Sequence, residues 1–290
     1  MLAYVNGLIT PEEDAKVSIN DRGWLYGDAV FETVRTYGGR VFKLIEHLER
    51  LQRSADLTGI DIPLTGADIE KALTELLKRE TTPGDVMARL TVSRGAGGAG
   101  LYPARPLKPT VVIQLRAIPD YSAETFSIGW RVIVAKTRRN NPSAINPQIK
   151  STNFLNNVLA KREAVEAGVN EALMLNHQGF IAESTVSNFF MVKAGQLRTP
   201  PVSDGILPGI TRETIINLAG VAGVPVWERS IEIEAAYTAD EAFLTLTSAG
   251  VIPVVSIDGR PVGDGRPGRV THQLLRLYAN HIDQFRKGGI

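Results

Sequence analysis

Lys150 stands where an extended segment gives way to a helix, in the stretch "INPQIKSTNFLNNVLAK". Pro147 holds the residue before it in an extended conformation. Apolar residues from Phe154 to Leu159 then recur at helical spacing. A lysine held at such a junction can offer its amine to an aldehyde and form a Schiff base. For any single lysine, an ordinary place on a turn is the alternative.

A phosphate-bearing aldehyde such as pyridoxal phosphate would also need an anion site. In "LPGITRET", a glycine precedes a predicted helix whose first backbone amides point outward unpaired. The segment "TLTSAG" adds hydroxyls, and an arginine adds a charge-assisted hydrogen bond. The candidates are Ile210, Thr211, Thr247, Ser248 and Arg50. The ordinary alternatives are that Thr211 caps its helix and that Arg50 pairs with Glu46 one turn away.

Pyridoxal phosphate stabilises a carbanion only while its ring nitrogen stays protonated, which calls for a buried carboxylate beside it. Glu183 is the one carboxylate in "FIAESTVSNFFMV", a run that predicts a long strand. A charge there is costly without a partner, so Glu183 is the candidate. A glutamate on an edge strand that faces water is the alternative.

The forked guanidinium of an arginine suits a substrate carboxylate. Arg35 shares a strand face with Phe31 and Thr33, while Arg89 and Arg94 flank "LTVS". Arginines on strand surfaces are common, so the weight lies on their joint occurrence with the lysine, the glutamate and the anion site.

The elements that must position these residues are predicted from periodicity. Asn6-Gly7 indicates a hairpin, "AVFETVRTY" alternates as a strand, and "LIEHLERLQRSADLTG" forms an amphipathic helix. Strands come in runs with fewer helices, which favours an α+β fold with mixed sheets over a doubly wound one. We expect an N-terminal α/β domain over 1–118, a linker over 119–125 and a C-terminal α/β domain over 126–290 that carries the lysine.

The composition excludes several classes of protein. The 290 residues carry a net charge of +1 without a long basic run, which argues against a nucleic-acid binder. Cysteine is absent, and the four histidines lack metal-ligand spacing, so we expect no metal site. The N-terminus lacks the pattern of a signal peptide and no apolar run is long enough to span a membrane, so we expect a cytoplasmic protein with no membrane partner.

The segments that carry the candidate residues resemble the class IV aminotransferases, which are fold-type IV pyridoxal-phosphate enzymes. This family includes branched-chain aminotransferases, D-amino-acid transaminases, (R)-amine transaminases and aminodeoxychorismate lyase. The resemblance covers essentially the whole chain, from "VNGLITPEEDAKVSINDRGWLYGDAVFETVR" and "HLERLQRSA" through "IKSTNFLNNVLAKREA" to "ESTVSNFFMV", "LPGITRE" and "FLTLTSAGVIPV". It implies pyridoxal 5′-phosphate as cofactor, two domains with the active site between them, and a homodimer or larger homo-oligomer whose second subunit completes the site.

By this resemblance, Lys150 binds the cofactor and moves the substrate proton, and Glu183 pairs with the pyridine nitrogen. Leu207 packs on the cofactor ring. The residues implied for the phosphate are Arg50, Ile210, Thr211, Thr247 and Ser248. The residues implied for the substrate side are Phe31, Thr33, Arg35, Arg89 and Arg94.

The subfamily patterns are mixed. Phe154 stands where branched-chain enzymes usually carry a tyrosine that bonds the cofactor's phenolic oxygen, and their "YxR" is replaced by a segment ending in Arg89. Arg94 in "VSRG" matches the D-amino-acid enzymes, but Ala96 replaces their histidine. "SRGAGGAG" and Thr33 resemble the lyase, without its frequent arginine. The segments "GDAVFETVR", "IKSTNFLNNVLAK" and "LPGITRE" together favour the branched-chain type.

Three kinds of function follow. A transaminase would move an amino group between an amino acid, branched-chain type favoured, and a 2-oxo acid such as 2-oxoglutarate, with D-amino acids or (R)-amines as alternative donors. A lyase on the same cofactor would release pyruvate from aminodeoxychorismate without a keto-acid acceptor. A non-catalytic binding protein would be colourless, and added pyridoxal phosphate would not stabilise it.

Overall fold

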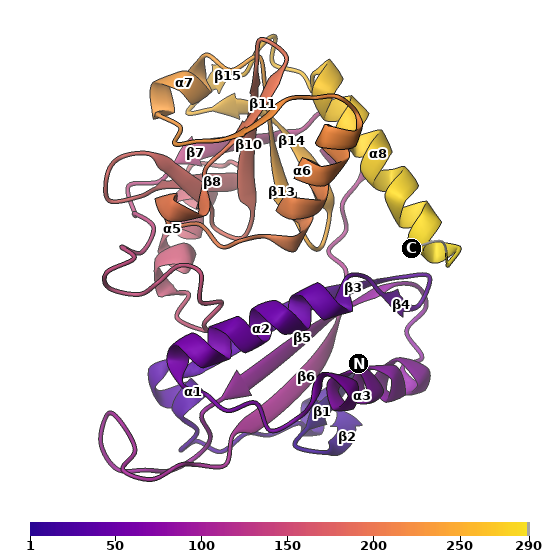
Figure 1. The fold of residues 1–290 in the computed structure, drawn as a ribbon, viewed down its shortest axis with the longest axis vertical. Coiled ribbons are helices and arrows are strands. Elements are labelled where there is room, and N and C mark those ends of the chain that lie inside the picture. The colour runs from indigo at the N-terminus through magenta and orange to yellow at the C-terminus, as the bar shows by residue number, and fades with distance from the viewer. Residues whose placement is uncertain (289–290) are drawn as a thin grey trace. The chain divides into compact units, whose positions relative to one another are not determined.

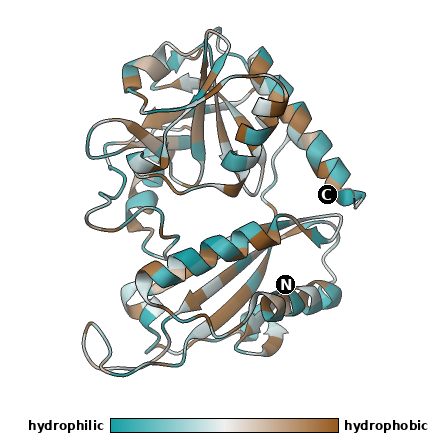
Figure 2. Cartoon of the chain, viewed as in Figure 1, coloured by the Kyte–Doolittle hydropathy of each residue, from teal (hydrophilic) through white to brown (hydrophobic). Residues whose placement is uncertain are grey.

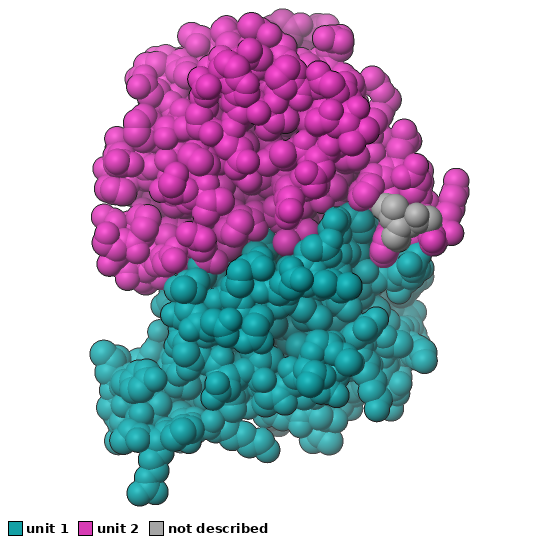
Figure 3. Space-filling view, in the orientation of Figure 1, with its two compact units in different colours: residues 1–119, 149–153 teal, residues 120–148, 154–290 magenta. Residues whose placement is uncertain are grey.

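The computed structural model describes residues 1–288. The chain divides into two compact units, residues 1–119 with 149–153 and residues 120–148 with 154–290, as Figure 3 shows in two colours. We expected one C-terminal domain over 126–290, whereas the short segment that contains Lys150 groups with the first unit.

The first unit is built on a six-stranded sheet in the order β2-β1-β6-β5-β3-β4, in which every pair is antiparallel (Figure 1). Its strands are β1 (Leu2–Val5), β2 (Leu8–Pro11), β3 (Ala29–Tyr37), β4 (Arg40–Val41), β5 (Val86–Ser93) and β6 (Thr110–Ala117). Its helices are α1 (Arg22–Tyr26), α2 (Leu44–Thr58) and α3 (Gly66–Arg79). The predicted hairpin is β1–β2, and both turn residues have positive φ, 48° at Asn6 and 102° at Gly7.

Alternation along β3 separates two environments. Val30 and Val34 are buried in a core that the central strands share with α2 and α3, where Leu51 and Leu73 are also buried. Figure 2 shows the matching pattern, with hydrophobic colour along β5 and β6 and alternating colours along α2. The residues on the opposite face of β3, among them Phe31, therefore point away from this core.

The second unit is built on a nine-stranded mixed sheet with the path β12-β11-β10-β13-β14-β7-β8-β9, and β15 pairs with β14. Its strands are β7 (Trp130–Val134), β8 (Glu171–Leu175), β9 (Ile181–Ser184), β10 (Asn188–Lys193), β11 (Gln196–Thr199), β12 (Val226–Glu228), β13 (Glu241–Leu246), β14 (Gly250–Ile257) and β15 (Arg260–Pro261). Its helices are α4 (Ala123–Ser127), α5 (Leu155–Glu166), α6 (Ile210–Val221), α7 (Ile233–Tyr237) and α8 (Arg269–Arg286). Helix α4 begins within the expected linker.

The long strand expected over "FIAESTVSNFFMV" is wrong, because the segment forms β9 and β10 with a turn between them. The Ser184 amide donates to the Ser187 carbonyl at 2.7 Å, and the Ser187 amide donates to the Ser184 hydroxyl at 3.1 Å. Serine side chains that bond nearby backbone groups compete with a strand ladder. The turn brings Asn188, the first residue of β10, next to Glu183 on β9.

Candidate active site

The backbone around Lys150 is held by two elements of the first unit. The Phe31 amide donates to the Lys150 carbonyl at 2.8 Å, and the Thr152 amide donates to the Ala29 carbonyl at 3.0 Å, so the segment runs along the start of β3. On the other side, the Lys150 amide donates to the Ser54 hydroxyl of α2 at 3.1 Å. The lysine is thus fixed in an extended segment, and α5 begins shortly after it.

The amine of Lys150 lies over an aromatic ring. Its Nζ is 4.7 Å from the centroid of Phe31, and the guanidinium carbon of Arg89 is 3.5 Å from the same centroid. Arg89 is directly opposite Thr33 in the β3–β5 pair, so the two residues share a face of the sheet with Phe31. Two cations and one ring therefore lie together on the face opposite the core.

Arg89 is poorly solvated for a cation. Burial, with a smaller contribution from the nearby charge of Arg116, lowers its pKa to about 10. Its guanidinium forms no ion pair with any residue among 1–288, which makes this face suited to a substrate anion. Arg35, from the same face of β3, has its guanidinium carbon 4.5 Å from the ring centroid of Tyr37.

Arg50 forms a buried ion pair with Glu32, a residue that the sequence analysis did not single out. Its Nε and Nη2 donate to the two carboxylate oxygens of Glu32 at 2.6 and 2.9 Å. His47 Nδ1 lies 2.8 Å from Glu32 Oε2, and all three side chains are buried. Glu46, the alternative partner considered for Arg50, pairs with Lys43.

The charges in this triad are set by opposing effects. Burial raises the pKa of Glu32, but the positive charge of Arg50 and the hydrogen bonds from His47 and Arg50 outweigh it and hold the pKa well below its usual range. Burial is the largest effect on His47 and lowers its pKa. We infer a carboxylate, a guanidinium and a neutral imidazole, with the imidazole proton on Nδ1 because a carboxylate can only accept.

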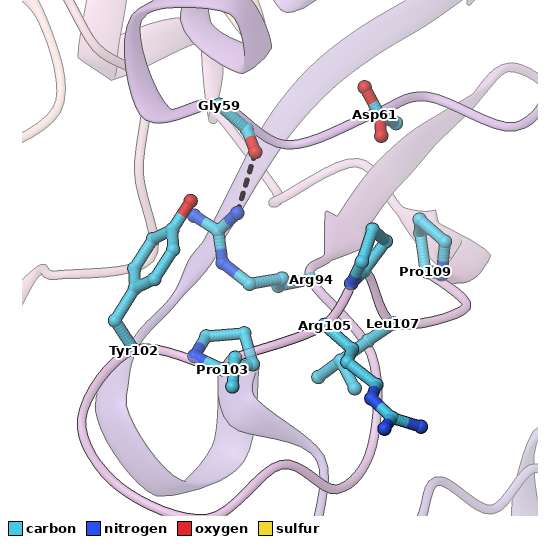
Figure 4. Close-up of a pocket in the computed structure, with 10 residues that line it drawn as sticks. Gly59, Asp61, Arg94, Tyr102, Pro103, Arg105, Leu107 and Pro109 are labelled. Atoms are coloured by element: carbon cyan, nitrogen blue, oxygen red, sulfur yellow. Dashed lines mark hydrogen bonds between the residues drawn. The ribbon is translucent and has the colours of Figure 1, made fainter.

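Arg94 is placed differently from the other candidate arginines. Its Nε and Nη2 donate to the two oxygens of Asp28 at 2.8 and 3.0 Å, and Nη2 and Nη1 donate to the carbonyls of Thr58 and Gly59 at 2.7 and 2.5 Å. It lines a small pocket beside the ring of Tyr102, where Figure 4 shows it pointing at the Gly59 carbonyl. Its guanidinium thus ties the end of β5 to the end of α2.

Glu183, in the second unit, is only 5% exposed, so its side chain does not face water although β9 ends the path of the sheet. Arg139 Nε donates to its Oε1 at 2.8 Å. The side-chain amide of Asn188 and the backbone amide of Leu207 donate to its Oε2 at 3.0 and 3.1 Å. The cation and the two donors stabilise the ionised form of a carboxylate.

The same contacts lead to the predicted phosphate residues of the second unit. Asn188 also bonds the Leu207 carbonyl at 2.9 Å, and a side chain added at Gly209 would collide with Asn188 Oδ1. Gly209 is the N-cap of α6 without a side-chain cap bond, so the amides of Ile210 and Thr211 begin the helix without a side-chain acceptor at the cap.

The remaining candidates follow β13. Asn188 is opposite Thr245 in the β10–β13 pair, and Thr247 and Ser248 come directly after that strand ends. The Ser248 hydroxyl lies 2.7 Å from the hydroxyl of Tyr121, which the sequence analysis had placed in a linker. One continuous set of contacts therefore joins Glu183 and the α6 N-terminus, and α6 packs against β13.

Four further residues of the site were missed. Glu32 had a signal, because alternation along β3 put a carboxylate on the same face as Val30 and Val34. Arg139 and Tyr121 lie in irregular segments with no periodicity, and Asn188 was hidden inside the expected long strand.

These residues fit pyridoxal phosphate. A fixed lysine, a buried carboxylate bonded by a cation and two amides, and helix amides open for an anion are the groups that the cofactor needs. Within residues 1–288 no group of three or more His, Cys, Asp or Glu could hold a metal ion. No described helix is long and apolar enough to cross a bilayer.

Comparison with known proteins gives consistent matches. A family model described as amino-transferase class IV matches residues 29–257. A putative branched-chain-amino-acid aminotransferase of Methanocaldococcus jannaschii is 44% identical over 278 residues, covering 96% of this chain and 95% of that protein. A D-alanine aminotransferase of Staphylococcus epidermidis is 36% identical, covering 96% and 97%. The solved branched-chain aminotransferase of Thermoproteus uzoniensis with norvaline has a TM-score of 0.90 at 36% identity, covering 100% of this chain and 95% of that one.

Proposed function

The chain belongs to the class IV aminotransferases, and from this premise we propose that it transfers the amino group of a branched-chain amino acid to a 2-oxo acid with pyridoxal 5′-phosphate as cofactor. When bound, pyridoxal phosphate supplies an aldehyde and a ring that accepts the electrons of the substrate carbanion. The protein's own residues bind that group, orient the substrate and move one proton.

Lys150 is the residue proposed for covalent attachment and for the proton transfer. Its Nζ takes the proton from the substrate α-carbon and returns it on the way to product. The hydrogen bonds to β3 and to Ser54 fix its backbone, so only the side chain needs to move. Glu183, kept ionised by Arg139, holds a proton on the ring nitrogen.

Two separate groups of residues are proposed to bind the cofactor phosphate and the substrate carboxylate. We assign Arg50 together with the α6 amides, Thr247 and Ser248 to the phosphate. Arg89 is assigned to the substrate carboxylate, because it is desolvated and forms no ion pair within the described chain. Phe31 supplies an apolar wall on the same face.

The position of Arg94 favours the branched-chain type over the D-amino-acid type. If Arg94 had the role of the matching arginine in the D-amino-acid enzymes, its guanidinium would have to bind a substrate. In this structure the guanidinium makes four hydrogen bonds to Asp28, Thr58 and Gly59. The relative from Staphylococcus epidermidis keeps D-alanine as the second candidate donor.

The observation that carries the proposal is the buried contact between Glu183 and Arg139, because it puts a carboxylate with a cationic partner next to an open helix terminus, and pyridoxal phosphate needs both an acid for its ring nitrogen and an anion site. The test follows cofactor absorbance after separate addition of L-leucine, D-alanine, (R)-1-phenylethylamine and aminodeoxychorismate, each without a keto acid. We expect L-leucine to convert the cofactor to its amine form fastest. Pyruvate release from aminodeoxychorismate without that conversion would instead identify a lyase, and a response to D-alanine alone would identify a D-amino-acid enzyme.

We also propose a homodimer or larger homo-oligomer. Trp24, Leu25 and Tyr26 of α1 are exposed, and so are Leu101 and Tyr102 in the loop that follows β5. Arg22 links the two segments by donating to the carbonyls of Gly100 and Leu101. An apolar surface of this kind is typical of a protein interface.

A further inference from the structure

Glu32 is a costly residue where it stands. Its side chain is 1% exposed, on the face of β3 that also carries Val30 and Val34. Burying an ion pair often gives no more stability than apolar residues of the same volume would. Stability alone therefore does not account for a carboxylate here, and its partners must be considered.

Both carboxylate oxygens of Glu32 have hydrogen-bond donors. Oε1 accepts from Arg50 Nε at 2.6 Å, and Oε2 accepts from Arg50 Nη2 at 2.9 Å. Oε2 also accepts from the Thr33 amide at 3.1 Å and lies 2.8 Å from His47 Nδ1. Four donors hold the carboxylate in one orientation, and the carboxylate in turn holds the guanidinium plane of Arg50.

The bidentate bond to Glu32 uses two of the three guanidinium nitrogens of Arg50. Nε and Nη2 lie against Glu32, so Nη1 is the nitrogen directed away from the carboxylate. A long arginine side chain otherwise loses rotamer freedom when it binds an anion. With Glu32 in place, that loss has already occurred.

Strand β3 carries both Glu32, which bonds Arg50, and Phe31, which bonds Lys150. Glu32 lies between Phe31, whose amide holds the Lys150 carbonyl, and Thr33, whose amide bonds Glu32 itself. Ser54 of α2 also joins the two, because its hydroxyl donates to the Arg50 carbonyl and accepts from the Lys150 amide. One strand and one helix thus set the positions of Lys150 and Arg50 together.

We propose that Glu32 is a positioning residue for the cofactor phosphate: its bidentate bond fixes the guanidinium of Arg50 in the orientation that binds the phosphate, and His47 holds the second carboxylate oxygen. This inference rests on the proposed function, because it needs Arg50 to bind the phosphate. Glu32 itself touches neither cofactor nor substrate.

The experiment compares two cofactor analogues that differ only in the phosphate. Dissociation constants for pyridoxal 5′-phosphate and for phosphate-free pyridoxal are measured by absorbance titration of the cofactor-stripped protein. The variants are Glu32→Gln, which removes the charge, Glu32→Asp, which retracts the carboxylate, and Arg50→Gln. Glu171→Gln is the matched control, because Glu171 is also 1% exposed on a strand and bonded by a cation and a hydroxyl, but in the second unit.

We expect Glu32→Gln to weaken binding of pyridoxal 5′-phosphate about tenfold, because Arg50 is then no longer held in place for its charge-assisted contact with the phosphate, while binding of pyridoxal changes by less than about twofold. Glu32→Asp weakens pyridoxal 5′-phosphate by less than Glu32→Gln, and Glu171→Gln changes neither constant. The ³¹P resonance of the bound cofactor shifts in Glu32→Gln but not in Glu171→Gln, which a merely structural role would not produce.

Equal weakening of both analogues in the Glu32 variants would overturn the inference and make Glu32 structural. So would unchanged binding in Glu32→Gln alongside phosphate-selective loss in Arg50→Gln. If the wild-type protein binds the two analogues equally well, the assignment of Arg50 to the phosphate fails first. If Glu32→Gln does not fold, the dissociation constants of Glu32→Asp and Glu171→Gln for pyridoxal 5′-phosphate and for pyridoxal are compared instead.

Discussion

At the scale of single residues, Arg139 is the cation that stabilises the ionised form of Glu183. The pair is almost fully buried, with the side chains 9% and 7% exposed. In such a place the Coulomb attraction and the desolvation of both ions are large and opposed, so the loss of one partner removes the attraction that offsets the desolvation of the other. Asn188 and the Leu207 amide remain as neutral donors, which moderates that loss without replacing the cation.

We therefore predict that Arg139→Gln lowers the free energy of unfolding by about 3 kcal/mol, the lower end for a broken buried ion pair. It also lowers kcat, because a Glu183 carboxyl that has taken up a proton cannot hold one on the cofactor ring. Urea unfolding and steady-state kinetics measure the two effects. Arg162→Gln is the control, since Arg162 and Glu166 form an exposed pair worth about 0.5 kcal/mol or less. Equal stability of the two variants would contradict the prediction.

Lys150→Ala should abolish covalent attachment of the cofactor and lower kcat by about 10²- to 10⁴-fold, the usual contribution of a positioned acid–base group. Borohydride reduction followed by peptide mass mapping shows the attachment: the wild-type protein carries the label at Lys150, and the variant carries none. Lys193→Ala, at an exposed pair with Asp240, keeps both label and activity. A reducible adduct on another lysine of Lys150→Ala would count against the assignment.

At the scale of elements, the close approach between α6 and the start of β10 is the most restrictive feature. Gly209 is the N-cap of α6, and its φ of −75° would suit any residue, so space and not backbone strain requires glycine. The missing side chain allows Asn188 to reach both Glu183 and the Leu207 carbonyl. One glycine thus permits the anion site and the acid site to share a neighbour.

Gly209→Ala is predicted to displace Asn188, because the added methyl group meets its Oδ1 at an impossible distance. Binding of pyridoxal 5′-phosphate should weaken about tenfold or more, and the protein should lose roughly 1–3 kcal/mol of stability from the strained contact. Gly220→Ala on the same helix is the control, since its added methyl group meets nothing and favours the helix. Absorbance titration and thermal melts measure both; identical results for the two variants would refute the steric argument.

Sequence patterns predict the elements of this fold well where the apolar positions of a periodic run are buried in a core. Alternation in "AVFETVRTY" gave the extent of β3 and both of its faces, because one face meets an apolar core. It could not give the partner of Glu32, since Arg50 is 18 positions away on a helix and only the packing of α2 on the sheet brings them together. The turn between Ser184 and Ser187 was missed because the apolar character of the segment resumes on both sides of it.

The residues implied by family resemblance are placed by the fold in two groups. Lys150, Arg50 and the arginines of β3 and β5 belong to the first unit, and Glu183, Leu207 and the α6 residues to the second. Resemblance transfers positions but not contacts. Arg139 could not be predicted because "KTRRNNPS" has no period that distinguishes one arginine from the next, and Arg94 could be matched to a motif without revealing its bonds to Asp28.

At the scale of the whole molecule, the exposed side chains of α1 and of the loop after β5 predict self-association. Trp24 is 75% exposed and Leu101 is 80% exposed. A double variant, Trp24→Asp with Leu101→Asp, should shift the sedimentation coefficient from dimer to monomer, because two charges would then have to be buried in the interface. Val221→Asp, at an 87% exposed position of α6 in the second unit, is the control and leaves the assembly unchanged. A wild-type protein that sediments as a monomer would rule out the interface.

The buried triad of the first unit gives the molecule an acid-sensitive stability. The folded state lowers the pKa of His47 below its ordinary 6.5, mainly through burial. Burial opposes the change at Glu32, but Arg50 and His47 outweigh it and lower that pKa below its ordinary 4.5. At acidic pH the unfolded chain therefore binds more protons than the folded one at both sites, so stability rises with pH. The His47 contribution is complete above pH 6.5 and is lost as the pH falls through its folded-state pKa; the Glu32 contribution is complete above pH 4.5 and is lost below it.

We predict that the free energy of unfolding of the first unit falls between about pH 7 and pH 5 and falls again as the pH drops below 4.5. His47→Gln removes the first decrease but keeps the second, whereas Glu32→Gln removes the second, because each decrease requires the titrating group itself. Hydrogen exchange at the amides of β3 and β5 reports this unit separately from the other. His272→Gln, on an exposed position of α8, keeps both decreases and serves as control. A flat profile from pH 7 to pH 5 in the wild-type protein would show that His47 is not held neutral by its buried surroundings, and the charge assignment of the triad would then have to be reversed.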